Sequence, residues 1–268
     1  MAHAGRRTSA GSEPPLYNLN EERSPVDVLC VLDRVTVAFG GVKAMDNVSL
    51  SIDAGAGITG IIGPNGAGKS TCLSVIAGAR RPTSGSVEVL GRRLNGRANT
   101  AKVARLGVAR TFQIPRPFAE MTIRENVMVA LIAGSHKRSE LAQRADDLLV
   151  RLGLESASEK SAGALPLAAR KKLEVARAMA INPKLLLLDE VFEGLSDSEI
   201  QDMVAILQGL HDDGIRLVLV EHVLRALRQL ATTLVVLEKG TVIAQGKVDD
   251  VLGSTQVKEA YLGFGGAN

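Results

Sequence analysis

The chain has 268 residues, of which 46% are hydrophobic and 23% charged, which is enough for one large domain with a sizeable core. Its formal net charge of +3 is spread along the sequence, and this argues against a nucleic-acid-binding surface. The two cysteines, Cys30 and Cys72, are too few and too far apart for a disulfide framework or a zinc cluster, and their scarcity is typical of a reducing compartment.

The first 27 residues are expected to form a flexible tail. They are rich in Gly, Ser, Pro and Glu, include Pro14-Pro15 and show no apolar period. No apolar segment follows Arg6 and Arg7, so a secretory signal is not expected. Because no apolar run approaches the roughly 20 residues that cross a bilayer, we expect a cytosolic protein, and any membrane-spanning part must belong to another chain.

The rest of the chain shows short apolar strands that alternate with helical patterns. Strands that are apolar on both faces and separated by helices are typical of a parallel sheet in an α/β layer fold. The predicted elements are, in chain order, antiparallel β hairpins within 28–52, a strand at 58–62, a helix at 69–77, a strand at 86–90, helical segments within 122–152 broken at Gly134-Ser135, a helix at 167–180, a strand at 185–188, a helix at 197–210, a strand at 217–220, a helix at 222–230 and a strand at 234–237.

A glycine-rich phosphate-binding motif lies between the strand at 58–62 and the helix at 69–77. Its pattern, GxxxxGK[ST], lets successive backbone N–H groups face one anion at the positive end of a helix. Lys69 is expected to reach the outer phosphates of ATP, and the Ser70 hydroxyl to ligate Mg²⁺. The alternative, a glycine-rich turn without a ligand, is disfavoured by the strand-loop-helix context. The predicted nucleotide-binding residues are Gly63, Pro64, Asn65, Gly66, Ala67, Gly68, Lys69, Ser70, Thr71 and Asp189.

Two later strands end in polar residues. The apolar strand at 185–188 runs into Asp189 and Glu190, at the end of a strand where ligands of α/β sheets bind. Asp189 is predicted to hold Mg²⁺ through water, and Glu190 to orient or deprotonate an attacking water. An acidic pair that merely opens a loop is the alternative. The strand at 217–220 ends at Glu221-His222, but a single histidine at a strand end is more often structural.

With these motifs the chain resembles the ATP-binding subunit of an ABC transporter from about Val31 to Gly263. The resemblance implies that Gln113 is the Q-loop glutamine, which takes part in catalysis and ligates Mg²⁺, and that His222 is the switch histidine. Glu190, His222 and Gln113 would form the catalytic set. Phe39 matches the position that stacks on adenine, although the residues alone allow it to be a core side chain equally well.

The similarity is closest to the subfamily that serves branched-chain amino acid uptake. It implies a homodimer or heterodimer of ATPase subunits, peripheral on the cytoplasmic side of the inner membrane, with separate permease subunits. A periplasmic or extracellular binding protein would deliver the substrate, no nucleic acid is involved, and the segment 114–126 would face the permease. The residues that carry this similarity are Phe39-Gly40-Gly41-Val42-Lys43-Ala44, Ile62 to Thr71, Arg110-Thr111-Phe112-Gln113, Met121 to Val127 and Ala260-Tyr261-Leu262-Gly263.

The implied fold is an α/β, RecA-like P-loop NTPase core with a mainly parallel sheet. An antiparallel β subdomain and a helical subdomain at about 115–180 would complete the ATPase domain. The domain is expected to span 28–263, with tails at 1–27 and 264–268.

One part of the family pattern is absent. The signature LSGGQ is replaced by Leu165-Pro166-Leu167-Ala168-Ala169. In a typical family member its serine hydroxyl and glycine N–H groups hold the γ-phosphate bound to the opposite subunit. Pro166 offers neither a hydroxyl nor an N–H, and Leu167 and Ala168 add Cβ atoms. The helix should still form, because proline suits its first turn. We expect the composite site that uses this segment to be slow or silent.

Several alternatives stay open at this stage. Two alternatives also belong to the ABC ATP-binding subunits. One is the ATPase of an export system, and the other is a nucleotide-binding subunit with little hydrolysis of its own. A non-transport protein that binds nucleic acid or ribosomes is disfavoured, because the sequence has no second ATPase cassette, coiled-coil insertion or basic patch. A GTPase is disfavoured because no Asn-Lys-x-Asp motif is present.

Overall fold

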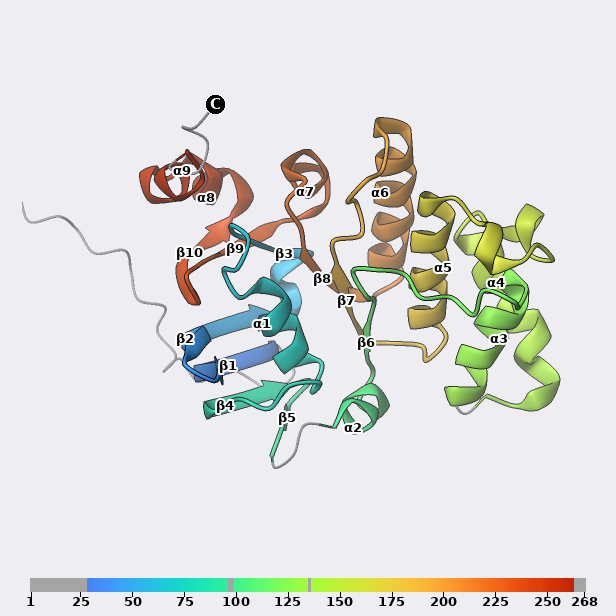
Figure 1. Cartoon of the computed structure of the whole chain (residues 1–268), viewed down its shortest axis with the longest axis horizontal. Coiled ribbons are helices and arrows are strands. Elements are labelled where there is room, and N and C mark those ends of the chain that lie inside the picture. Colours follow the sequence, from blue (N-terminus) through green and yellow to red (C-terminus); the bar gives the residue numbers. More distant parts are fainter. Residues whose placement is uncertain (1–27, 96–98, 135, 263–268) are drawn as a thin grey trace, which may run out of the picture.

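A computed structural model describes residues 28–95, 99–134 and 136–262, with the backbone alone for residues 261 and 262. The tails predicted at 1–27 and 264–268 lie outside these residues, and the domain limits 28–263 stay a prediction. Figure 1 shows two sheets beside each other and a group of helices at the far side of the second sheet. None of the helices among the described residues has the length and apolarity needed to cross a membrane.

The first sheet is antiparallel and is built around one long hairpin. Its order is β2-β1-β4-β5. The predicted hairpin is confirmed, but β1 is a single continuous strand, because the chain passes an irregularity at Arg34 (φ 48°) without leaving the sheet. The strands are β1 (Val28–Phe39), β2 (Val42–Asp53), β4 (Ser84–Val89) and β5 (Arg92–Arg93).

The second sheet is mainly parallel, as the apolar strands predict. Its order is β10-β9-β3-β8-β7-β6, and within the described residues only the β9–β10 pair is antiparallel. The strands are β3 (Thr59–Ile62), β6 (Val108–Arg110), β7 (Leu185–Asp189), β8 (Arg216–Val220), β9 (Thr233–Glu238) and β10 (Thr241–Lys247).

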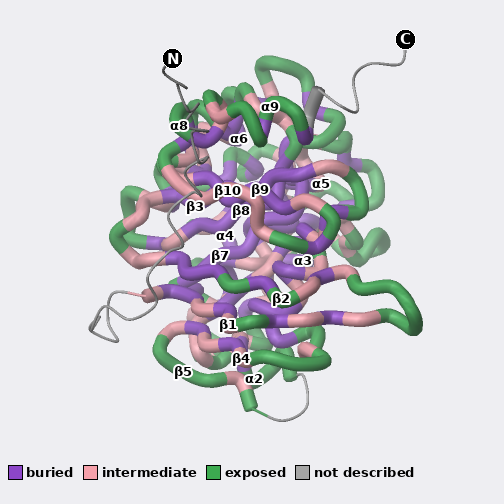
Figure 2. Tube along the Cα trace, turned by 90° about the vertical axis from the view of Figure 1, so that its left-hand side faces the viewer, coloured by how far each residue is buried: buried purple, intermediate pink, exposed green. Residues whose placement is uncertain are grey.

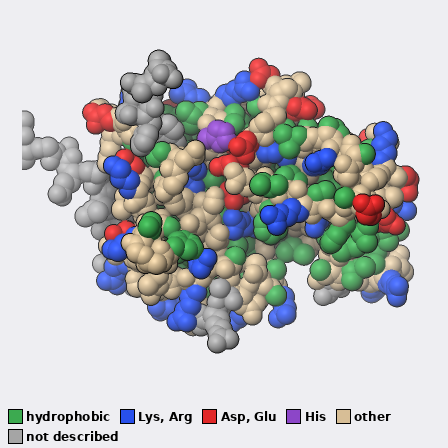
Figure 3. Space-filling model, viewed as in Figure 1, with side chains coloured by type: hydrophobic (Ala, Val, Ile, Leu, Met, Phe, Trp, Pro, Cys, Tyr) green, Lys and Arg blue, Asp and Glu red, His purple; other side chains and the backbone are tan. Residues whose placement is uncertain are grey.

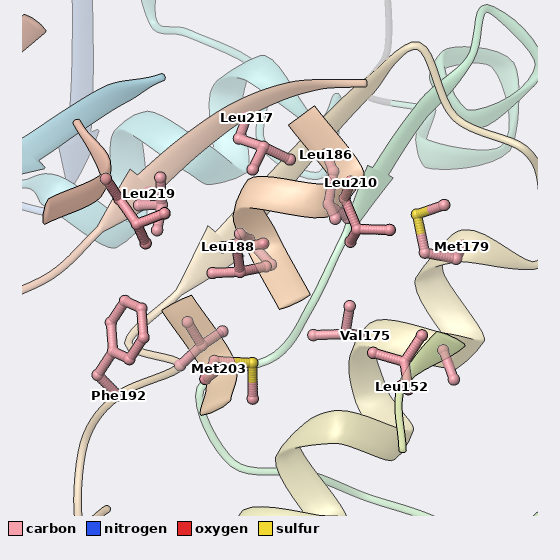
Figure 4. Close-up of a cluster of buried hydrophobic side chains, with 14 of the residues drawn as sticks. Leu152, Val175, Met179, Leu186, Leu188, Phe192, Met203, Leu210, Leu217 and Leu219 are labelled. Atoms are coloured by element: carbon pink, nitrogen blue, oxygen red, sulfur yellow. The ribbon is translucent and has the colours of Figure 1, made fainter. Parts of the chain in front are cut away.

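Alternate residues of the central strands enter two different cores. Leu185 and Leu187 face α1 (Lys69–Ile76), which packs between the two sheets, whereas Leu186 and Leu188 face α6 (Asp197–Asp212). Figure 4 shows the side chains of Leu186, Leu188, Leu217 and Leu219 packed near those of Met203 and Leu210. Figure 2 shows that buried residues, in purple, run through the middle of the molecule. The central strands are therefore fixed from both sides, which holds their ends at defined positions.

The helical layer consists of α3 (Ile123–Ala133), α4 (Leu141–Arg151) and α5 (Leu167–Met179). The side chain of Thr122 accepts a hydrogen bond from the N–H of Glu125, and Glu125 accepts one from the N–H of Thr122, so a capping box starts α3. The break predicted at Gly134 separates α3 from α4. Figure 1 shows the segment from β6 to α3 crossing from the sheet to this layer.

Several elements differ from the prediction. The helix predicted from His222 begins at Leu224, because the N–H of Glu221 still bonds to the carbonyl of Ile61 and Val223 has non-helical dihedral angles. The strand predicted at 86–90 occupies 84–89. Several short or half-exposed elements have no clear hydrophobic period and were not predicted. They are β5, β6, β10, α2 (Thr100–Arg105), α8 (Val248–Gly253) and α9 (Thr255–Leu262). The helix α7 (Leu224–Leu230) is shorter than predicted.

Candidate functional site

Four neighbouring strands of the parallel sheet end at the same edge and bring the sequence motifs together. In the order β3-β8-β7-β6, they are followed by the glycine loop, Glu221-His222, Glu190 and the segment 111–113. Carboxyl ends of parallel strands are where α/β folds bind ligands. Motifs that are more than 100 residues apart in the sequence therefore meet because of strand order alone.

The glycine loop is held tightly against its surroundings at two positions. Gly63 (φ 152°) and Gly68 (φ 100°) have dihedral angles that L side chains rarely adopt. A Cβ atom at Gly63 would lie 2.1 Å from the carbonyl oxygen of Leu237, and one at Gly68 would lie 2.3 Å from that of Ala44. The loop can follow this path only with glycine at both positions.

Lys69 lies under the loop that it follows. Its side chain is 6% exposed, and its Nζ donates hydrogen bonds to the carbonyl oxygens of Gly63 (2.7 Å) and Pro64 (3.1 Å). Burial lowers the pKa of Lys69, and the carboxylates of Glu190 and Asp189 oppose that shift. The ammonium group is thus held at the mouth of the loop, close to two carboxylates.

Asp189 lies behind Ser70 and is fixed by three neighbours. The Ser70 hydroxyl donates to its Oδ1 (3.4 Å), and the Arg110 guanidinium donates to its Oδ2 (2.8 Å). The N–H of Asp189 donates to the Thr111 hydroxyl (3.2 Å), and Arg110 also donates to Ser74 (2.8 Å). A hydroxyl at the start of α1 and a carboxylate at the end of β7 therefore face each other, which is the type of oxygen pair that Mg²⁺ prefers.

Glu190 occupies a strained position at the end of β7. Its φ of 50° is in the left-handed region, and its N–H donates to the carbonyl of Val220 (2.9 Å). The Gln113 amide donates to its Oε2 (2.5 Å), so Gln113 contacts this carboxylate rather than Asp189. Burial, followed by the charge of Glu193, raises the pKa of Glu190. Once ionised, a carboxylate with a raised pKa is a stronger base, so it accepts a proton from water more readily.

A cleft of about 890 Å³ joins these residues. His222 is exposed and lines it, while the side chain of Glu221 is buried. The lining also includes Ala44 and Ala260, which are not among the predicted site residues, and Ala260 comes from α9. The lining residues are Ala44, Gly63 to Thr71, Gln113, Glu190, Glu193, His222 and Ala260.

Phe39 lies outside the lining of this cleft. It is 45% exposed at the end of β1, which excludes the core role that the residues alone allowed. The Arg80 guanidinium lies 4.5 Å from the centre of its ring. An exposed aromatic ring at this position stays compatible with stacking on a base.

The donor set of the cleft fits Mg·ATP. The loop supplies backbone N–H groups at the N-terminus of α1, where anions bind. Lys69 and Ser70 supply an ammonium and a hydroxyl group to the lining of the cleft, and the Asp189 carboxylate lies behind Ser70. The volume of the cleft is within the range of sites for cofactors. The roles of the individual residues stay predictions.

The segment in place of the signature leads into α5 as predicted, with Leu165 buried and Pro166 and Leu167 exposed. Pro166 is the N-cap residue, has extended dihedral angles and makes no side-chain cap. The Leu167 side chain is 43% exposed, and its Cδ2 would lie 2.8 Å from a Cβ placed on Gly194. An apolar surface therefore stands where polar donors would be needed to hold a phosphate.

Sequence analysis missed three charged side chains near Glu190. Arg110 pairs with Asp189, Lys171 donates to the carbonyl of Glu190 (2.6 Å), and Glu221 accepts from the N–H of Phe192 (2.9 Å). Lys171 could have been noticed, because it lies four residues from both Leu167 and Val175 and so shares their helix face. Nothing in the sequence indicates the partner of Arg110.

Stability should depend on pH through Glu221. Burial raises the pKa of Glu221 to about 7, compared with about 4.3 for an exposed glutamate. Its contribution to stability is therefore fully present below the unfolded-state pKa and is lost as the pH rises through about 7. Between pH 5 and pH 8 this group should lower the free energy of unfolding by about 1 to 3 kcal/mol. Urea unfolding at both pH values should show a smaller fall for Glu221→Gln, and equal falls would contradict the assignment.

The amino-acid sequence is similar to those of known proteins over most of the chain. The family model described as "ABC transporter" matches residues 45–193. The chain is 34% identical over 253 residues to the high-affinity branched-chain amino acid transport ATP-binding protein LivG of Salmonella typhimurium, which covers 88% of this chain and 98% of LivG.

Two solved structures are similar in fold. The ADP conformation of MJ1267, an ATP-binding cassette of an ABC transporter, superimposes with a TM-score of 0.79 and 29% identity, covering 88% of this chain and 99% of MJ1267. The dimeric, post-hydrolysis state of the ATP-binding cassette MJ0796, bound to ADP and Pi, gives a TM-score of 0.74 and 26% identity, covering 82% and 99%. The predicted fold class is thereby confirmed.

Proposed function

This chain belongs to the ABC transporter family, and on that premise we propose that it is the ATP-binding subunit that energises import of branched-chain amino acids or related small amides. The single observation that carries the proposal is the convergence of Lys69, Ser70 and Glu190 in one cleft, with Asp189 directly behind Ser70. The substrate class is supported by the similarity to LivG along nearly the whole of that protein.

The residues of the glycine loop would hold the phosphates, and Ser70 with Asp189 and Gln113 would hold Mg²⁺. When bound, Mg·ATP supplies a γ-phosphoryl group for transfer to water. Lys69 would exchange its hydrogen bonds to the loop carbonyls for the outer phosphates. Arg110 keeps Asp189 oriented toward Ser70 through its contact with the opposite carboxylate oxygen. Phe39 would stack on the adenine.

Glu190 would orient the attacking water and accept its proton. Its carboxylate is reached by Gln113 from one side, and His222 lies in the same cleft. The charge of His222 counteracts the rise in the pKa of Glu190, so the two groups interact electrostatically. Gln113 and His222 would therefore control when the Glu190 carboxylate is free to bind the attacking water.

The partners would be permease subunits, a second ATPase subunit and, through the permease, a substrate-binding protein. The segment after Gln113 carries exposed apolar side chains, including Ile114 (67% exposed) and Phe118 (47% exposed). Figure 3 shows hydrophobic side chains gathered on this face over the part that holds α3 and α4. Exposed apolar patches of this kind mark protein contacts, and here they support contact with a permease subunit.

The altered signature implies a division of labour between two unlike subunits. In a dimer of this family each nucleotide lies between the glycine loop of one chain and the signature of the other. Pro166, Leu167 and Ala168 offer no side-chain donor, so the site that uses them would turn over slowly. The site built on Lys69 and Glu190 would be active if the partner supplies an intact signature.

Replacement of Lys69 by Ala should weaken Mg·ATP binding. Loss of one charge-assisted contact to phosphate costs about 1.5 to 3 kcal/mol, which corresponds to an affinity about 10- to 150-fold lower. Isothermal titration calorimetry with Mg·ATP measures the change. Lys184→Ala is a control, because Lys184 is exposed and directly precedes β7, at the opposite end of that strand from Asp189. Undiminished binding by Lys69→Ala would remove the basis of the proposed function.

One alternative is supported by a specific observation. The altered signature also suits a subunit that binds nucleotide and hydrolyses almost none. Turnover in the complex copurified with its permease distinguishes the two functions, because only an active subunit loses turnover when its own Glu190 is changed. Gene neighbours distinguish import from export. Neighbouring genes for a binding protein and two permeases indicate an import system.

A further inference from the structure

Two buried charged side chains beside Glu190 have no part in the function proposed above. Lys171 is 4% exposed and Glu221 is fully buried, although charged side chains are rarely buried in proteins unless they are paired. Lys171 comes from α5, and Glu221 follows β8. Both side chains end at the backbone of the segment 190–192, and they approach it from two different elements.

Lys171 binds the first carbonyl of that segment. Its Nζ donates to the backbone oxygen of Glu190 at 2.6 Å, a short, charge-assisted hydrogen bond. Burial lowers the pKa of Lys171, and the nearby carboxylates of Glu221, Glu193 and Glu190 counteract that shift. Removing this ammonium would leave a buried carbonyl without this donor.

Glu221 binds the other end of the segment. Its Oε1 accepts the N–H of Phe192 at 2.9 Å, while its Oε2 has no hydrogen-bond partner among the described residues. Phe192 is itself 1% exposed and packs in the core shown in Figure 4. The two hydrogen bonds thus hold the segment at residue 190 and at residue 192.

A segment held in this way can keep Glu190 in its unfavourable conformation. A left-handed φ costs a non-glycine residue of the order of 1 kcal/mol, so the surroundings must impose it. With the backbone of Glu190 fixed by Lys171 and by its N–H bond to Val220, the side chain can meet Gln113. A loosened segment would let the carboxylate swing away from the position where a water must be held.

We propose that Lys171 and Glu221 are positioning residues that set the Glu190 carboxylate, so that α5 orders this chain's own site although its first turn has lost the signature. The proposal rests on the proposed function. It separates two roles: residues 165–169, which lead into α5, would face the nucleotide of the other subunit, whereas Lys171 contacts Glu190 of its own chain. The two parts should therefore affect different sites of the dimer.

The test is ATP turnover by the complex copurified with its permease subunits. Lys171→Met should lower kcat by about 10- to 100-fold, as expected for a misplaced catalytic group, and leave the Kd of Mg·ATP within about threefold. Lys171→Arg keeps a buried cationic donor and should retain most of kcat. Lys172→Met is the matched control, since Lys172 is the next residue on α5 and is partly exposed. It should behave like the wild type.

A double-mutant cycle separates positioning from a general effect on the fold. In a Glu190→Gln background, Lys171→Met should cause no further loss, because the group that it positions is already gone. Glu221→Leu should resemble Lys171→Met, while Glu221→Gln keeps an acceptor for Phe192 and should retain kcat. If Lys171→Met does not fold, Lys171→Gln, one bond too short to make the same contact, should show the same loss of kcat.

Three results would overturn the proposal. These are a wild-type kcat in Lys171→Met, equal losses in Lys171→Met and Lys172→Met, or a full additional loss in the Glu190→Gln background. If Glu190→Gln itself leaves turnover unchanged, the proposed function has failed. If Glu190→Gln removes turnover and Lys171→Met does not, only the positioning role has failed.

Discussion

Glu190→Gln should lower ATP turnover of the assembled transporter by about 10²- to 10⁴-fold, the usual contribution of a general base. The Gln side chain has nearly the same shape and can still meet Gln113, but it cannot accept a proton from water. Affinity for Mg·ATP should stay within about threefold, because Lys69, Ser70 and Asp189 are unchanged. Steady-state turnover and calorimetry measure the two quantities separately.

Glu193→Gln provides the matched control. Glu193 lines the same cleft and is exposed, so the substitution removes a carboxylate of the same charge within the same loop. It should lower turnover far less than Glu190→Gln does, because Glu193 raises the pKa of Glu190 but does not itself accept the proton. Equal turnover in Glu190→Gln and the wild type would show that another group accepts the proton, and would remove Glu190 from the catalytic set.

Restoring the signature should raise the ATP turnover of the isolated chain. We expect a gain of about 10²- to 10³-fold for Pro166→Ser, Leu167→Gly, Ala168→Gly and Ala169→Gln combined, by analogy with the effect of one transition-state donor. The reason is that two copies of the restored chain can build complete composite sites, whereas two copies of the unchanged chain cannot. Turnover of the purified chain at high concentration, with and without the four changes, measures the effect.

Two controls accompany this experiment. Adding Glu190→Gln to the restored chain should abolish the gain, because the hydrolytic site is still the one at the end of β7. Thermal unfolding should confirm that α5 survives, since Gly in a helix costs about 1 kcal/mol relative to Ala. Brisk turnover by the unchanged chain alone, lost in Glu190→Gln, would show that residues 165–169 already support hydrolysis.

Most of the parallel sheet could be predicted from local patterns. The strand at 185–188 is a run of four leucines that ends in two acids, and this pattern has few other interpretations. The helix at 167–180 was found at nearly its observed bounds because its apolar period is clear. By contrast, β6 has three residues and β10 is half-exposed, so neither produces a period long enough to recognise.

The site was predictable where chemistry depends on sequence spacing. Gly63, Gly68, Lys69 and Ser70 work as one local unit, because the loop between a strand and a helix fixes their geometry. The pairing of Gln113 with Glu190 was not predictable, since 77 residues separate them and only the neighbouring positions of β6 and β7 bring them together.

By itself the sequence determined the fold class, the phosphate loop and the acidic strand end, because each depends on short-range spacing of residue types. Only the tertiary structure decided what holds Glu190 in place. Lys171 and Glu221 are charged residues that a sequence assigns to the surface, but in the fold both are buried and bind the segment that follows β7, one from α5 and the other from the end of β8. Burial and hydrogen-bond partners arise from the arrangement of distant elements, and no local pattern encodes that arrangement.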